Sequence, residues 1–133
     1  MAGKTTYLKN ALLNYVAHAT SYTPPSGLYL ALYPSGTPPT VSGGGTEVST
    51  GGGSAYARQL ITFSTATTGV LTNTALIIFP QAGSAWGTIG FFAIFDALTA
   101  GNMLFFGSFA TPRTINTTDV FEVLASNLTL TEI

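Results

Sequence analysis

Apolar residues recur at intervals of three and four positions near the start of the chain, the spacing that places side chains on one face of an α-helix. A proline pair at 24–25 disfavours helical geometry in the residue before it, so the helix must end ahead of that point. The pattern therefore predicts one helix over residues 5–20, capped by Thr5 or Thr6. Its apolar stripe consists of Leu8, Leu12, Tyr15 and Ala19.

After this helix the pattern changes to short apolar and aromatic runs separated by glycine and proline. Polar and apolar residues alternate through 127–131, as in a half-buried antiparallel strand. The run at 28–33 is apolar on both faces and therefore needs cover on both sides. Strands are predicted over residues 28–33, 56–63, 69–72, 75–79, 86–95, 103–109 and 120–130.

Short strands with frequent turn signals are typical of all-β architectures. We therefore predict a single domain over residues 1–133, a mainly antiparallel β-sandwich with one N-terminal α-helix lying across a sheet or reaching to a neighbour. The spacing leaves open whether the strand order is jelly-roll or immunoglobulin-like. The residues expected to line the core are Leu28, Leu30, Leu32, Leu60, Ile78, Ile89, Ile94 and Leu128.

A stretch of proline, glycine, serine and threonine separates the first two predicted strands, over residues 34–54. It contains two triple-glycine runs, at 43–45 and 51–53. Loops of this length in compact domains are usually mobile or used for contact, and the sequence favours neither over the other. Residues 46–48 have the character of a short edge strand.

Charge narrows the range of possible partners, because only 7% of the residues are charged. Four bases scattered along the chain supply no basic stripe for a nucleic-acid backbone. No apolar run approaches the length of about 18 residues that a membrane helix needs. The start of the chain shows no secretory signal, so we expect synthesis in a cytoplasm. We expect neither nucleic acid nor a membrane as a partner.

Candidate chemistry is sparse. Residues 3–6, Gly-Lys-Thr-Thr, imitate the end of a phosphate-binding loop but lack the preceding strand and glycine. The one histidine, His18, lies on the polar side of the predicted helix, and Asp119 and Glu122 are spaced to point to opposite strand faces. With no cysteine and no cluster at metal-ligand spacing, we predict no catalytic, cofactor-binding or metal-binding residues and a protein that is not an enzyme.

Two further residues stand out. Arg58 lies in an otherwise apolar run and needs a carboxylate partner, for which Glu47 and Asp96 are the candidates; a structural ion pair is the favoured interpretation. Trp86, if exposed near Asp96, would be the one candidate for a sugar platform, so a carbohydrate-binding module remains a remote alternative. Aromatic residues crowd 86–109, where one sheet face would form the core and the other would be covered by the helix or by a second subunit.

Several segments in the same order resemble a family of small virion structural proteins of tailed bacteriophages, described as tail-fibre-like or head-decoration (cement) proteins. The resemblance implies a non-enzymatic structural protein of the virion. The segments that carry it are residues 4–14, 28–33, 45–48, 56–59, 79–80, 86–89, 92–97 and 101–104.

From this resemblance we expect a cement protein on the outer capsid surface that ties neighbouring major capsid proteins together. It would also self-associate, with a trimer as one arrangement. The alternative is a tail-associated subunit of a fibre, a collar or the periphery of a baseplate. The residues taken as candidate interface residues are Tyr7, Leu8, Leu12, Tyr15, Glu47, Arg58 and Trp86.

Overall fold

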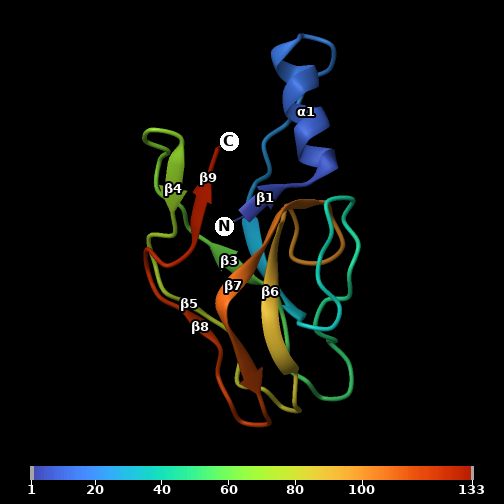
Figure 1. Ribbon diagram of the computed structural model, residues 1–133, viewed down its shortest axis with the longest axis vertical. Helices are drawn as coiled ribbons and strands as arrows, with labels where there is room; N and C mark the ends of the chain where they lie inside the picture. Colours follow the sequence, from blue (N-terminus) through green and yellow to red (C-terminus); the bar gives the residue numbers. More distant parts are fainter. Residues whose placement is uncertain (1, 133) are drawn as a thin grey trace.

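The computed structural model describes residues 2–132, so the first and last residues of the predicted 1–133 domain lie outside the described part. Five strands form an antiparallel sheet in the order β1-β7-β6-β2-β3 (Figure 1). Their bounds are β1 Ala2–Lys4, β2 Leu28–Pro34, β3 Gln59–Ile61, β6 Gly87–Phe95 and β7 Met103–Ile115. The single helix of the described residues, α1, spans Thr6–Val16.

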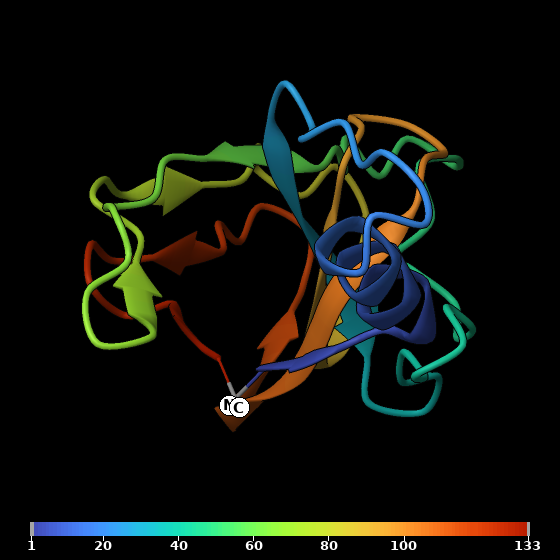
Figure 2. The same ribbon diagram turned by 90° about the horizontal axis from the view of Figure 1, so that it is seen from above.

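Two small antiparallel sheets form the second layer, each made of two strands. Figure 2 shows this layer across the core from β6 and β7, with β3 and β5 bordering each other where the two layers meet. The all-β sandwich with one N-terminal helix, predicted from the sequence, is confirmed. The strands of the second layer are β4 Val70–Thr72 paired with β9 Thr129–Thr131, and β5 Ile77–Ile78 paired with β8 Glu122–Val123.

The core lies between the layers. Of the residues predicted to line it, five are buried: Leu30, Leu32, Ile89, Ile94 and Leu128. Leu28 is partly buried and packs against this core. The predictions for Leu60 and Ile78 are wrong, because these side chains are 60% and 51% exposed. Their sequence neighbours Ile61 and Ile77 point inward, and strand alternation then turns Leu60 and Ile78 to solvent.

The other face of the five-stranded sheet carries a second apolar cluster, centred on Tyr33, Phe95 and Met103. In Figure 2 the segment from 35 to 55 and α1 lie on this side of β6 and β7, away from the second layer. The start of α1 is joined to this loop segment by a hydrogen bond from the Thr6 N–H to the Val41 carbonyl, at 2.8 Å. The chain itself therefore covers most of the face for which the sequence left open a second subunit.

Hydrogen bonds organise the long loop. The Thr37 hydroxyl donates to the Thr46 carbonyl at 3.0 Å, and the Thr46 N–H donates back to the Thr37 carbonyl at 3.2 Å. Gly45 has φ +95°, and an added Cβ would collide with the Pro38 carbonyl, so this turn requires glycine. Residues 46–48 form no strand; Val48 alone extends the edge of β2, through one bond from its N–H to the Leu32 carbonyl at 3.0 Å.

The helix is shorter than predicted. Thr5 caps its start, where the Thr5 Oγ1 accepts a hydrogen bond from the Leu8 N–H at 3.3 Å. It ends at Val16 because His18 adopts φ 58° and the N–H groups of Ala19 and Thr20 both turn back to the Asn14 carbonyl. The chain then returns alongside the helix to β2 (Figure 1).

Candidate interaction surfaces

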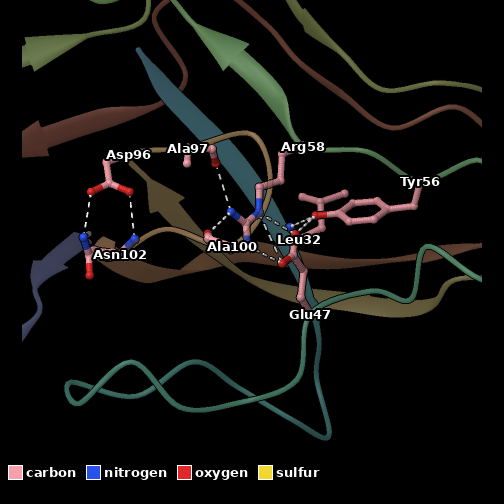
Figure 3. Close-up of polar contacts among 8 residues, drawn as sticks. All are labelled: Leu32, Glu47, Tyr56, Arg58, Asp96, Ala97, Ala100 and Asn102. Atoms are coloured by element: carbon pink, nitrogen blue, oxygen red, sulfur yellow. Dashed lines mark hydrogen bonds and ion pairs between the residues drawn. The ribbon is translucent and has the colours of Figure 1, made fainter. Parts of the chain in front are cut away.

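Glu47, Tyr56 and Arg58 form one polar cluster at the base of the long loop (Figure 3). Arg58 Nη2 and Nε donate to the two carboxylate oxygens of Glu47 at 2.9 and 3.0 Å, a bidentate ion pair. The Tyr56 hydroxyl donates to Glu47 Oε1 at 2.6 Å and accepts the Leu32 N–H at 2.9 Å. Burial, and next the negative charge of Glu47, raise the pKa of Tyr56.

The remaining Arg58 donor reaches the turn between β6 and β7. Nη1 donates to the carbonyls of Ala97 at 3.0 Å and Ala100 at 2.7 Å. The guanidinium side chain is only 9% exposed and stacks on the ring of Phe95. We call Glu47, Tyr56 and Arg58 the clamp, because they fasten the long loop, the segment before β3 and the β6–β7 turn to one another.

The clamp fits the structural ion pair favoured from the sequence, with Glu47 as the partner. Asp96, the other candidate, instead accepts hydrogen bonds from the backbone N–H of Asn102 at 2.7 Å and from its side-chain amide at 3.0 Å. It thereby closes the β6–β7 turn (Figure 3). Because Glu47 and Arg58 satisfy each other and are mostly buried, they fix the shape of the loop surface and offer little charge to a partner.

Trp86 belongs to the core and not to an interface. It is 5% exposed, and its Nε1–H donates to the Ser54 carbonyl at 2.9 Å. Its ring packs edge-on against Tyr56 and Phe79, with centroid distances of 5.4 and 6.3 Å. An exposed sugar platform on Trp86 is therefore excluded, and so is a direct role for this side chain in contacting a partner.

The other candidate interface residues lie on α1, which projects from one end of the sandwich (Figure 1). Leu8 is buried at the base of the helix and serves the fold. Leu12 is half-buried, whereas Tyr7 and Tyr15 are 45% and 56% exposed. The structure thus keeps the two tyrosines at the surface, where they remain candidate contact residues.

The structure also reveals a groove that the sequence did not predict, with a volume of about 800 Å³. It opens between β7 and the segment that contains β8 and β9. The described pairing of β1 with β7 runs to Gly107, and beyond this residue the outer edge of β7 has no ladder partner among residues 2–132. Phe109 and Phe121 line the groove on its apolar side, and Arg113 and Glu122 line it among polar residues. No local signal marks it, because its walls come from segments paired with different neighbours.

The charged side chains of residues 2–132 are dispersed over the molecule, apart from two ion pairs. The ion pairs among residues 2–132 are Glu47–Arg58 and Lys4–Glu132, the latter joining β1 to the residue after β9. Within the same residues no three His, Asp or Glu side chains gather as a metal site would require. In the described part of the chain α1 is neither long nor apolar enough to cross a membrane.

The comparison with protein families gives one finding. The family model described as "Podophage GP4 fiber I protein gp80" matches residues 3–131. The match includes α1, the long loop with its clamp and both walls of the groove. None of the curated proteins matches the chain.

Proposed function

Because the chain belongs to the family of podophage GP4 fiber I protein gp80, phage virion structural proteins of tail-fibre-like type, we propose that it is a non-enzymatic subunit of a virion fibre. The observation that carries this proposal is the extent of the family match, which covers residues 3–131 and so includes every surface described above. The family description names a fibre, which favours the tail-associated alternative over capsid decoration.

The use of polar groups supports a role without catalysis. Glu47 and Arg58 bind each other in the clamp, and the Asp96 carboxylate closes the β6–β7 turn. Asp119 accepts the Asn116 N–H at 2.9 Å and closes another turn. Among the described residues, every buried side-chain polar atom has a hydrogen-bond partner, which makes a rigid body for presenting surfaces.

In this proposal the sandwich is the rigid part and contact is made by burial. The exposed side chains of α1 and the groove beside β7 are two surfaces that the described chain leaves open to a partner. With few charges available, contacts would rest on apolar side chains, on hydroxyl and amide groups, and on free backbone groups at the β7 edge. Such contacts depend on shape, as expected of a subunit with a fixed place in an assembly.

Capsid decoration is the second candidate, and the compact shape of the molecule favours it. Residues 2–132 form one sandwich, without an elongated shaft of repeated units (Figure 1). A compact unit of this kind fits a position on the outer capsid surface, where it would tie neighbouring major capsid proteins together. The major capsid protein and further copies of this chain would then be its partners.

Copy number separates the two candidates. Purified virions are separated on a stained gel, and the band of this chain is quantified against the major capsid protein by mass spectrometry with labelled peptides. A fibre subunit is expected at tens of copies per particle or fewer, and a decoration protein at hundreds. Absence of the chain from purified virions would overturn both.

A further inference from the structure

We propose that α1 is a self-association element, and that its exposed apolar side chains pack against α1 of further copies of this chain. The inference rests on the proposed function, in which a virion subunit is present in repeated copies. It concerns the projecting helix, whose outer half makes few contacts with its own sandwich (Figure 1).

The first argument is the exposure of apolar side chains near the end of the helix. Leu13 is 69% exposed, Tyr15 56% and Val16 74%, and the whole segment from 13 to 21 is exposed. Large apolar side chains gathered on one projecting element mark an interaction surface more often than a free one.

The second argument is the stability of the helix itself. Isolated helices shorter than about 12 residues are marginal in water. α1 has 11 residues, no acidic residue in its first turn, no basic residue in its last turn, and only Leu8 buried. Its anchors to the sandwich lie at its base, where Thr5 caps the helix, the Thr6 N–H binds the Val41 carbonyl and Leu8 is buried. Packing against another helix would supply the missing stabilisation where the helix projects.

The third argument is the width of the apolar surface. At 3.6 residues per turn, the positions from Tyr15 through Leu12 and Val16 to Leu13 span roughly 160° of the helix circumference, with Lys9 as the one charge among them. A helix that packs on a single partner needs an apolar stripe of about 100°. Within this arc Leu8 is buried and Leu12 is half-buried, so Tyr15 lies on one exposed flank and Val16 and Leu13 on the other. Two exposed flanks allow each helix to contact two neighbours, as in a closed ring of three or more copies.

Area and charge point to copies of this chain. The three most exposed apolar side chains of α1 present roughly 350 Å², about half of the 800 Å² per partner that a standard interface buries. This area supports concentration-dependent association of identical helices, which many copies held in one particle would strengthen. A helix with one charge carries no pattern of charges to select a different protein, and copies with net charge -1 repel one another weakly.

Sedimentation velocity on the purified full chain, from low micromolar to several hundred micromolar, tests the inference. The wild-type chain is expected to shift from 13.8 kDa to a defined oligomer as concentration rises. The double variant Leu13→Glu, Val16→Glu should remain monomeric over the same range. The matched control, Asn10→Glu with Asn14→Glu, adds the same charge on the opposite side of α1 and should associate like the wild type.

Trp86 provides the check on folding. It is the one tryptophan of the chain and is buried, so blue-shifted emission reports an intact core in each variant. A wild-type chain that is monomeric at every concentration would overturn the inference, and so would an apolar-face variant that is folded and associates normally. Either result would leave the family membership and the virion copy number unchanged. Failure of the proposed function is detected separately, by the stained gel of purified virions.

Discussion

The guanidinium carbon of Arg58 lies 3.6 Å from the centre of the Phe95 ring, so one side chain covers an aromatic face while its donors hold the long loop and a turn. Arg58→Ala should therefore leave Glu47 buried without its partner and uncover Phe95. We expect a loss of about 2–4 kcal/mol in the free energy of unfolding, measured by urea titration. Arg58→Lys should recover only part of it, because lysine lacks the bidentate fork and stacks poorly.

Arg113→Ala is the matched control, since Arg113 is exposed and has no ion-pair partner among residues 2–132. It removes the same charge and should leave the urea midpoint nearly unchanged. Equal effects of Arg58→Ala and Arg113→Ala would show that the clamp contributes nothing beyond net charge.

Asn73 is fully buried and joins the end of β4 to the turn between β8 and β9, so its replacement should be costly. Its Nδ2 donates to the carbonyls of Ala75 at 2.9 Å and Leu124 at 3.0 Å, and its Oδ1 accepts the Leu128 N–H at 2.9 Å. Asn73→Leu leaves these groups unpaired, and we expect a loss of about 3 kcal/mol in thermal or urea unfolding.

The variant Asn73→Asp keeps the size of the side chain and changes its hydrogen-bonding groups, so it tests the hydrogen bonds alone. The ionised carboxylate would face two carbonyl oxygens, so the folded state should favour its neutral form and raise the pKa of this carboxyl above the unfolded value of about 3.9. The variant should then be least stable at neutral pH and regain stability as pH falls through the raised folded-state pKa toward the unfolded one. A penalty that does not depend on pH would contradict this account.

Tyr33 and Tyr56 should resist ionisation. Burial, with the charge of Glu47 as the second cause, raises the pKa of Tyr33 from 10.0 to about 12, and that of Tyr56 is raised further. The unfolded chain ionises these groups first, so folding stability should be constant below pH 10 and fall as pH rises from 10 toward 12. Absorbance titration at the phenolate band should show late ionisation that coincides with unfolding, and Tyr56→Phe should remove part of the late component.

Retention on the particle should be insensitive to salt. The chain has four bases and five acids, of which Glu47 and Arg58 are paired internally, so screening has few intermolecular charges to act on. Virions washed in about 1 M NaCl and sedimented should keep this chain in the pellet at its original ratio to the major capsid protein. Release by salt alone, without urea or detergent, would show that ion pairs dominate the contact.

The strand pattern predicted much of the fold because alternation and apolar runs are local properties. The run 28–33 became β2, apolar on both faces and covered on both, and Leu30, Leu32, Ile89 and Ile94 are buried as expected. The strand at 103–109 was predicted too short, because β7 continues to Ile115 past a bulge opposite Gly90 and through Pro112.

Other features depend on contacts that no local pattern specifies. Alternation does not state which of two apolar neighbours points inward, and this ambiguity misplaced Leu60 and Ile78. The helical stripe correctly located α1 but does not reveal that the helix projects, because spacing carries no information on whether anything covers the stripe. The groove is formed by segments far apart in sequence. The sequence left open an exposed Trp86 because its hydrogen-bond partner, the Ser54 carbonyl, lies in a glycine-rich loop.

The ion pair between Lys4 and Glu132 places the two ends of the described chain at neighbouring points of the sandwich. α1 starts at the same place, while the turns before β6 and after β7 lie at the opposite end (Figure 1). The sandwich therefore has two unlike ends, or poles. One pole holds the chain ends and the projecting helix, and the other consists of tight turns. A fluorescent protein or affinity tag inserted in the turn at 116–119 would stand far from the helix, and would report which pole faces outward on an intact particle.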